Sequence, residues 1–579
     1  MPDHNDEQFV QRRLLLASLL SAAVILGYFY TQSLFAPPAP APEPGGETAA
    51  IEQPATPQSP TPAAEPDAAA EPTDGPEIAA ANGPEQVVAA SEQEIVVESD
   101  AFRAVFSNRG AVVKSWTLKN YKSSAGEPLD LVNQEGAKEH GFPFTFVDSG
   151  GEKIPAVADA LFRVNEGPAE RMAPTTLEFE LVHNGVRARK TFHFDKQGYV
   201  FEVNSELTQN GTGTPHRLAW TGGFGDTAHQ QDWIYSKSFY FDPEGGEIEW
   251  IDADDAEDAV IANRGAFPFV GLEDHFFTAV FLPEEGSRVA LETSAVELRP
   301  QPDSTKTETY VAVSVGGETE NQFHVFVGPK DVDELQKVDP RMRNIVDFGF
   351  FGFIAEPIFL MMRWMYDNVV ANWGWTIVIV TIIINLALFP LKWKGSRSMK
   401  RMQQLQPLVQ EINEKYRGLS MKDPRKQEQN EELMALYKKY NVNPVGGCLP
   451  MLLQLPFFYG FYRLLTVAIE MRQAEWLWVT DLSQPETLPI RVLPLAMMAT
   501  QFWMQSMTPT PAADPAQMRV MKFMPLMMGF IFYGFQSGLV LYWLTSNLVG
   551  VAQQALLNKL PGESLDIELA RPRGKKRKK

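Results

Sequence analysis

Residues 443–458 read NPVGGCLPMLLQLPFF, and this stretch decides the fold expected for the chain. A basic segment ends there, and a strongly apolar run begins after a pair of glycines. Its turn and helix-entry residues are Pro444, Gly446, Gly447, Pro450 and Pro456. Proline removes a backbone hydrogen bond, and a membrane helix tolerates that loss only where neighbouring helices satisfy the freed group. The stretch therefore predicts a membrane helix that is packed in a bundle.

Charge is distributed unevenly along the 579 residues. The mean hydropathy of −0.19 hides apolar runs at the N-terminus and after residue 345. The net charge of −21 arises mostly between those runs, whereas basic residues gather in 392–439 and in the tail. This asymmetry predicts a membrane protein whose basic segments face the cytoplasm. The tail cations are Arg571, Arg573, Lys575, Lys576, Arg577, Lys578 and Lys579.

Six apolar segments are close to the length of a membrane span. We place them at about 14–35, 373–391, 449–470, 490–507, 519–536 and 538–557. We interpret residues 1–36 as an uncleaved anchor. The alternative is a cleaved signal peptide, but Leu34 and Pro37 would flank the cut unfavourably. Six spans would leave both termini in the cytoplasm and obey the positive-inside rule. The single cysteine, Cys448, excludes an intramolecular disulfide, and we expect it to pack in the helix entrance.

Three parts are expected between the anchor and the second span. Residues 37–93 are rich in Pro, Ala and Glu and predict a disordered tether. Residues 94–340 contain alternating runs, such as 102–106 and 310–315, which predict a large extracytoplasmic β-sandwich. Residues 341–372 combine apolar residues at helical spacing with charges, which predicts an amphipathic helix on the outer membrane surface.

The remaining chain is expected to be helical. Residues 373–560 predict a five-helix membrane core, and 561–579 a basic cytoplasmic tail. Within the core, the loop 392–447 carries two apolar helix faces separated by a break at 418–424, which predicts a cytoplasmic helical hairpin. The predicted fold class is therefore mixed: a polytopic α-helical membrane bundle of six spans plus a large β-sandwich.

Polar residues inside the predicted spans are the best pointers to function, because they are costly in hydrocarbon. They include Thr381, Asn385, Tyr459, Arg463, Thr466, Ser546 and Asn547. Thr381 and Asn385 are four residues apart and share one helix face. Glu470 follows Arg463 by seven residues and is its expected partner near the outer interface. We find no nucleotide-binding loop, metal-ligand cluster or nucleophile triad in the sequence, so we expect no enzymatic activity and no cofactor.

Two stretches, 443–458 and SGLVLYWLTSN at 537–547, closely resemble the YidC-type membrane protein insertases of the Gram-negative type. The resemblance implies an inner-membrane insertase and chaperone with a large periplasmic β-sandwich, which is similar to carbohydrate-binding domains of sugar mutarotases. It implies a hydrophilic groove, open to cytoplasm and lipid, that receives nascent membrane proteins and releases their helices into the bilayer. The resemblance also implies that the insertase acts either alone or together with the Sec translocon.

The chain departs from this family at two positions. Where the family normally has a groove arginine, this chain has Asn385, and where the family has an aromatic residue, this chain has Arg463. One interpretation is that the groove cation has moved to the third span, with Tyr459, Thr466, Ser546 and Asn547 lining the same groove. The alternative is that Arg463 snorkels to the outer interface.

Other function classes remain open from the residues alone. A small-anion transporter or channel could use Arg463, although the internal repeats typical of transporters are missing from the sequence. An anchored carbohydrate-binding protein would use the β-sandwich. The tail cations and the hairpin predict contact with the ribosome, and anionic lipid is the competing partner. We expect membrane lipids as partners and no DNA.

Overall fold

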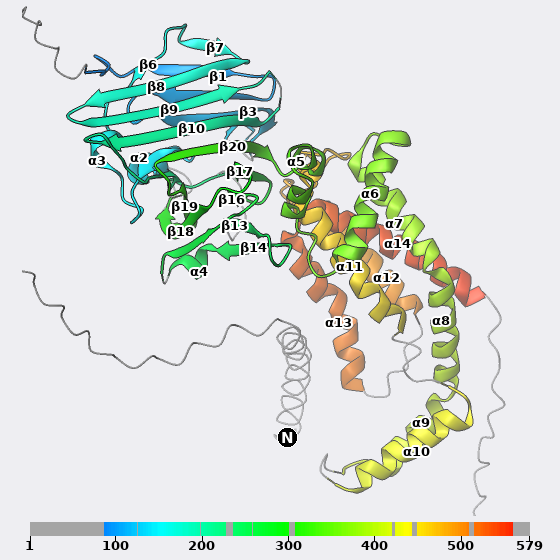
Figure 1. The fold of residues 1–579 in the computed structure, drawn as a ribbon. Coiled ribbons are helices and arrows are strands. Elements are labelled where there is room, and N and C mark those ends of the chain that lie inside the picture. Colours follow the sequence, from blue (N-terminus) through cyan, green and yellow to red (C-terminus); the bar gives the residue numbers. More distant parts are fainter. Residues whose placement is uncertain are drawn as a thin grey trace, which may run out of the picture. The chain divides into compact units, whose positions relative to one another are not determined.

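The computed structural model covers the full chain and describes residues 86–123, 126–196, 198–226, 236–257, 259–299, 307–419, 423–442, 449–508 and 515–559. Of residues 449–453 and 515–522 it describes the backbone alone. The predicted anchor 1–36, most of the predicted tether and the tail 561–579 lie outside these residues, as do Pro444, Gly446, Gly447 and Cys448. Figure 1 shows strands from the first half of the described chain and helices from the second.

The predicted β-sandwich is a domain of three sheets, called the β-domain below (Figure 1). The first sheet has the order β4 (Pro128–Asp130), β3 (Val112–Lys122), β2 (Phe102–Ser107), β1 (Glu94–Glu98) and β7 (Glu170–Met172). The second has the order β14 (Glu247–Asp252), β13 (Lys237–Asp242), β16 (Val270–Glu273), β17 (Phe277–Pro283), β20 (Glu320–Pro329), β10 (Val200–Gln209), β9 (Val186–Phe194), β8 (Thr175–His183) and β6 (Arg163–Val164), with β11 (Thr212–Gly213) beside β10. The third has the order β15 (Ile261–Gly265), β18 (Val289–Leu298), β19 (Glu308–Gly316), β12 (Arg217–Trp220) and β5 (Thr145–Val147).

Alternation of apolar and polar residues explains these strands. In β10, every second side chain is buried, because neighbouring residues of a strand point to opposite faces of the sheet. The predicted runs at 102–106 and 310–315 are confirmed as β2 and β19. The buried faces share one aromatic-rich core that includes Phe102, Trp116 and Phe201. The short helices of the domain are α2 (Gln134–His140), α3 (Pro155–Ala158), α4 (Ala253–Glu257), α5 (Val332–Val338) and the 3₁₀ helix η1 (Pro340–Ile345).

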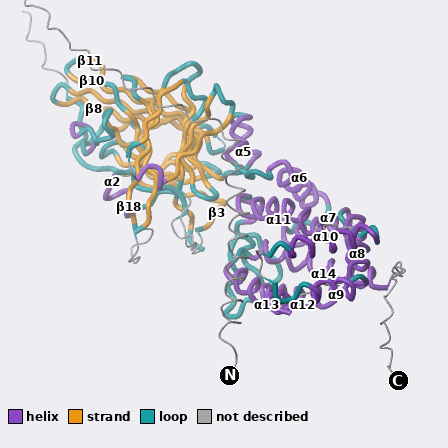
Figure 2. Tube along the Cα trace, turned by 90° about the horizontal axis from the view of Figure 1, so that it is seen from below, coloured by secondary structure: helices purple, strands orange, loops and turns teal. Residues whose placement is uncertain are grey.

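Helices follow from residue 352 onward and form what we call the helical domain. They are α6 (Gly352–Asn368), α7 (Trp373–Ala387), α8 (Phe389–Gln404), α9 (Gln406–Lys415), α10 (Arg425–Lys439), α11 (Leu449–Val467), η3 (Ile469–Met471), α12 (Val492–Met507), α13 (Pro515–Ile531), η4 (Phe532–Gly534) and α14 (Ser537–Lys559). Figure 2 shows these helices gathered apart from the strands. Helix α6 matches the predicted amphipathic helix, and α9 with α10 matches the predicted hairpin.

The second predicted span is interrupted. Helix α7 ends at Ala387, and α8 begins at Phe389 at an angle of 55° to it. Pro390 stands in the first turn of α8, and proline there removes a hydrogen bond that would continue the preceding helix. Within the described residues, α7 and α8 taken together have the length and apolar character for a span, whereas no helix alone has them. The predicted span 373–391 therefore corresponds to α7 and the first turn of α8 with a bend between them, and the number of spans stays a prediction.

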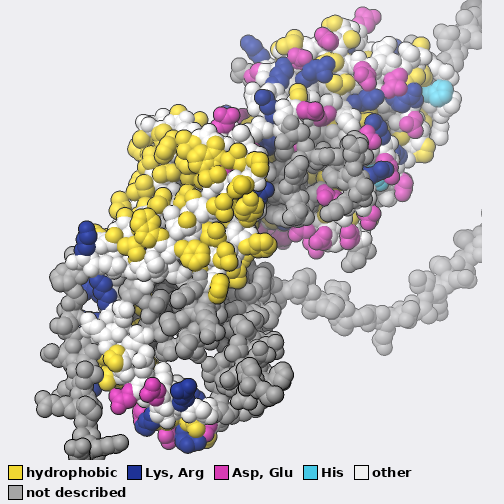
Figure 3. Space-filling view, turned by 180° about the vertical axis from the view of Figure 1, so that it is seen from behind, with side chains coloured by type: hydrophobic (Ala, Val, Ile, Leu, Met, Phe, Trp, Pro, Cys, Tyr) yellow, Lys and Arg dark blue, Asp and Glu magenta, His cyan; other side chains and the backbone are white. Residues whose placement is uncertain are grey.

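On the face drawn in Figure 3, a broad apolar patch covers part of the helical domain, whereas the β-domain carries many charged side chains. Large apolar side chains exposed on the helical domain include Phe353, Leu360 and Trp364 of α6, Phe502 and Trp503 of α12, and Phe523, Leu526, Met527 and Phe530 of α13. Exposed apolar surface of this extent marks an interaction site, which can be a membrane. The arrangement suits helices that face hydrocarbon.

Candidate functional site

A polar cluster lies between α7, α8 and α14. It consists of Asn385, Lys392, Ser546 and Gln553, and we call it the polar cluster below. The side chains of Asn385, Ser546 and Gln553 are buried, and Lys392 is half-buried. Helices α7 and α14 pack directly against each other, so their facing residues exclude water from this region.

Asn385 is the centre of the polar cluster. Its Nδ2 donates to the Thr381 carbonyl at 2.9 Å and to the Ser546 Oγ at 3.3 Å. Its Oδ1 accepts from the Lys392 Nζ at 2.7 Å. Its backbone carbonyl accepts from the Gln553 Nε2 at 2.9 Å. A buried amide retains its hydrogen bonds only when partners from several helices are placed around it, so these contacts fix α7 against α8 and α14.

Thr381 and Asn385 share a face as predicted, but their roles differ. The Thr381 hydroxyl donates to the Ile377 carbonyl at 2.6 Å within its own helix. Such a bond satisfies a buried hydroxyl without a partner helix. Asn547 is adjacent to Ser546 in sequence but points to α12, where its Nδ2 donates to the Met497 carbonyl at 3.3 Å. Thus the structure brings Asn385 and Ser546 together and places Asn547 on another helix contact.

Arg463 lies in a separate group. Its guanidinium forms an ion pair with Asp347 at 2.9 Å and also donates to the Asp347 carbonyl at 2.7 Å. Tyr459 packs against Phe351, and the Thr466 hydroxyl donates to the Tyr462 carbonyl. The expected pairing of Arg463 with Glu470 is wrong, because the guanidinium of Arg463 forms its ion pair with Asp347. These contacts do not support a relocation of the groove cation to Arg463.

Comparison with known proteins covers almost the whole chain. Residues 94–361 match the family described as "YidC periplasmic domain", and residues 364–563 match the family described as "60Kd inner membrane protein". A membrane protein insertase YidC from Syntrophus aciditrophicus is 33% identical over 574 residues, which are 95% of this chain and 100% of that protein. One from Geobacter sp. is 32% identical over 482 residues, 81% of this chain and 86% of that protein.

The chain belongs to the YidC family of membrane protein insertases. This confirms the resemblance carried by 443–458 and 537–547. A solved structure described as an active YidC insertase with its first transmembrane domain resolved covers 81% of this chain and 93% of that chain, at 19% identity and a TM-score of 0.34.

Two residues of the polar cluster were not recognised as a site from the sequence of this YidC family member. In the sequence, Lys392 is one of many basic residues in the loop 392–447, and Gln553 is one of several polar residues in the last predicted span. A usable signal was the spacing: Lys392 follows Asn385 by seven residues, or two helical turns. The helix-entry motif adds less, because Pro456 lies inside α11, the side chain of Pro450 is not described, and the glycines are outside the described residues.

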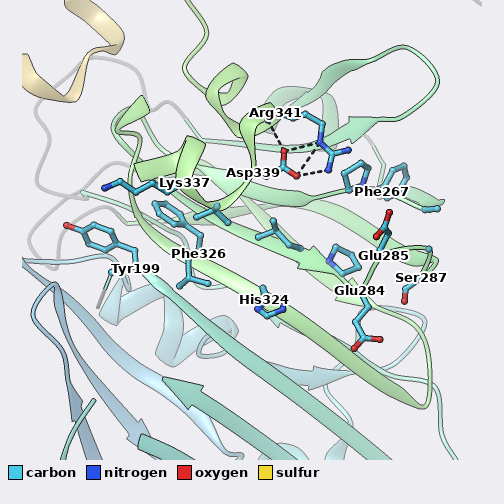
Figure 4. A pocket seen from close by; sticks show the side chains of 18 of the residues that line it. Tyr199, Phe267, Glu284, Glu285, Ser287, His324, Phe326, Lys337, Asp339 and Arg341 are labelled. Carbon is cyan, nitrogen blue, oxygen red and sulfur yellow. Dashed lines mark hydrogen bonds and ion pairs between the residues drawn. The ribbon is translucent and has the colours of Figure 1, made fainter. Parts of the chain in front are cut away.

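The β-domain holds a pocket of about 850 Å³ beside β20 and α5 (Figure 4). Aromatic side chains of Tyr199, Phe267 and Phe326 line it together with charges of both signs. Asp339 accepts from Arg341 at 2.6 Å, so this carboxylate is already neutralised. No group of metal-ligating side chains occurs in the described part of the chain. Sugar binding by the β-domain stays an untested alternative to a scaffold or partner-docking role.

Proposed function

We propose that this chain inserts membrane proteins into the inner membrane, with the β-domain in the periplasm and both termini in the cytoplasm. The observation that carries the proposal is the polar cluster, which lies inside a helical domain whose surface carries a broad apolar patch. Similarity to the YidC insertases over 95% of the chain supports the same conclusion.

Physical chemistry explains what such a cluster can do. Moving a polar segment of a client protein into hydrocarbon costs a large desolvation free energy, because its amides and charges lose their hydrogen bonds to water. A groove lined by Asn385, Ser546 and Gln553 offers replacement hydrogen bonds part of the way across. The apolar helix of the client meanwhile partitions along the exposed apolar side chains of α12 and α13 into lipid. Insertion then requires no covalent chemistry and no cofactor.

Partners follow from this role. We propose nascent membrane proteins as clients, the Sec translocon as a partner for larger clients, and a chaperone activity during their folding. The hairpin of α9 and α10, together with the tail cations, is proposed to contact the ribosome or anionic lipid. Thr381 and Asn547 are proposed to line the groove beside the polar cluster, while Tyr459, Arg463 and Thr466 lie in the separate group around Asp347.

The competing transporter function is less well supported. A binding charge for a small anion must be available to the anion, whereas the guanidinium of Arg463 is already paired with Asp347. A carbohydrate-binding function would reside in the β-domain and would be lost on its removal.

Reconstitution tests the proposal. The purified chain, placed in proteoliposomes, is expected to insert a single-spanning client with a short polar N-terminal tail. The double substitution Asn385→Leu and Ser546→Ala removes two neutral polar groups of the cluster and is expected to reduce insertion several-fold. Asn368→Ala changes an exposed amide of α6 and serves as the matched control. Absence of insertion by the unmodified chain, while a control insertase is active, would contradict the proposal.

A further inference from the structure

A tight turn exposes apolar side chains in the connection between α11 and α12, residues 468–491. The backbone N–H groups of Trp476 and Val479 donate to each other's carbonyls at 2.8 Å, so Leu477 and Trp478 form the tip of the turn. Leu477 is 65% exposed and Trp478 is 41% exposed. We call residues 476–479 the tryptophan turn below.

Leucine is an unusual residue at this tip. The backbone φ of Leu477 is 51°, in the left-handed region that glycine, asparagine and aspartate fill in most tight turns. A leucine there adds an exposed apolar side chain to a backbone conformation that leucine rarely adopts. In water, a small polar residue would suit both the turn and the exposure better. The residue type therefore indicates that the tip meets an apolar environment.

The tryptophan turn is held firmly by the helices beside it. The ring of Trp476 lies so close to Gly374 of α7 that a Cβ added to this glycine would be 2.2 Å from the Trp476 Cδ1. Further along the connection, the Leu482 carbonyl accepts from the backbone N–H of Gly538 in α14 at 2.8 Å. These contacts fix the tip at the end of the bundle where α7 and α14 begin.

The two carboxylates near the turn are bound by the protein itself. Asp481 and Glu486 are the only charged residues in 477–490. The buried Glu486 accepts from the Trp478 Nε1 and, at 2.9 Å, from the Leu493 backbone N–H in the first turn of α12. Asp481 is half-buried and accepts from the backbone N–H two residues further on, at 2.8 Å. Every exposed residue of this segment is therefore uncharged.

Exposed apolar residues on both sides extend the tip into a patch. Trp375 at the start of α7 is exposed, and so are Leu488 and Ile490 before α12. The ring centroids of Trp375 and Trp476 are 5.6 Å apart, and those of Trp476 and Trp478 are 5.8 Å apart. Tryptophan gathers at the boundary between lipid headgroups and hydrocarbon, because its ring is apolar and its N–H is polar.

We propose that the tryptophan turn, together with Trp375, Leu488 and Ile490, docks into the headgroup boundary of the outer leaflet and so fixes the depth of the bundle in the membrane. The proposal rests on the topology of the proposed function, which puts this end of the bundle on the periplasmic side. Lipid is the occupant because the patch continues into Val492, which is exposed at the start of α12, and because the exposed residues around the turn offer no charge to a polar partner.

Depth-resolved fluorescence quenching tests this proposal. In the background Cys448→Ser, which removes the single cysteine, Leu477→Cys is labelled with a fluorophore and reconstituted in vesicles of phosphatidylethanolamine and phosphatidylglycerol. Nitroxides near the headgroup end of the acyl chains are expected to quench this label at least two-fold more strongly than a matched label at Val260→Cys, an exposed apolar position of the β-domain. Iodide in the water should quench the two labels in the opposite order.

A charge at the tip gives a second arm. With the label at Ile490→Cys, the substitution Leu477→Asp is expected to reduce nitroxide quenching at least two-fold, because an aspartate is costly in hydrocarbon and withdraws the patch from it. Leu477→Met keeps the tip apolar and should leave the quenching unchanged. A turn with a merely structural role would give the same quenching in both variants.

Three outcomes would overturn the proposal. Equal quenching of the labels at Leu477→Cys and Val260→Cys would place the tip in water. Protection of the Leu477→Cys label from both nitroxides and iodide would mean that protein covers the tip, either a second copy or another part of this chain. Absence of nitroxide quenching at Phe523→Cys of α13 as well would contradict the proposed function together with this proposal, since the helical domain would then not lie in the bilayer.

Discussion

The two domains of this chain distribute their polar residues in opposite ways. The β-domain buries rings such as Trp116 and Phe201 and places most of its charges outside, whereas the helical domain buries Asn385, Ser546 and Gln553 and exposes rings such as Phe523. The same rule produces both, because apolar side chains avoid water in one case and face hydrocarbon in the other. The difference indicates which solvent each domain was selected to meet.

The comparison extends to how the domains treat charge. Inside the β-domain, the buried guanidinium of Arg217 is neutralised by Glu292. Inside the helical domain, the ammonium of Lys392 meets only amide oxygens among the described residues. The buried Arg217 is thus held by a counter-charge, whereas the half-buried Lys392 is held by neutral amide oxygens.

Breaking the buried ion pair should have the largest effect. Glu292→Gln leaves the guanidinium of Arg217 buried without a counter-charge, which costs about 3–5 kcal/mol of unfolding free energy. Glu318→Gln removes an exposed partner of Arg264 in the same sheet and should cost less than about 1 kcal/mol. Calorimetric unfolding of the full chain in detergent measures both. Similar values for the two variants would contradict the architectural role of the buried pair.

An aspartate placed on the surface of each domain tests whether the helical domain faces lipid and the β-domain faces water. Phe523, in the middle of α13, and Met172 of β7 each have 67% exposure. Phe523→Asp is expected to oppose membrane integration by roughly 3 kcal/mol, the cost of aspartate near the centre of a spanning helix. Met172→Asp should have an effect close to zero in water. The fraction of each variant that resists alkaline extraction from membranes is the measurement, and equal fractions would show that α13 does not face lipid.

Local patterns predicted much of this fold, because they depend on neighbouring residues. Alternation marked β2 and β19, and helical spacing marked α6. Pairings between distant segments were not predictable in this way. Arg463 is paired with Asp347, which precedes it by 116 residues, and the nearby Glu470 was the wrong choice.

The polar cluster shows the same limit in the candidate site. Its members Asn385 and Ser546 were named from the cost of polar groups in spans, which is a local argument. The orientation of Lys392 depends on the bend between α7 and α8 and on the position of α14. Pro390 was a visible sign of that bend, but the sequence does not give the direction in which the ammonium then points.

The smallest predicted effect concerns acid. Burial lowers the pKa of His216 to about 4, against an ordinary value of 6.5. Its Nδ1 donates to the Thr214 carbonyl at 3.2 Å, and its Nε2 accepts from the Asn321 amide at 3.2 Å, an arrangement that requires the neutral ring. Between the two pKa values the unfolded chain binds more protons than the folded one, so the β-domain loses stability as the pH falls.

This acid effect should be measured as a difference, because another group acts oppositely. Burial raises the pKa of Asp274 to about 6, so its carboxyl favours the folded state as the pH falls. His216→Asn removes only the histidine contribution. From about pH 6 to about pH 4.5, the unmodified chain should lose about 2 kcal/mol more unfolding free energy than the variant, since each unit within the window is worth about 1.4 kcal/mol. Denaturant unfolding of the β-domain signal in the full chain, followed by tryptophan fluorescence, provides the two profiles. Parallel profiles would mean that His216 titrates alike in both states, and that the β-domain tolerates a charge at this buried position as the helical domain does at Lys392.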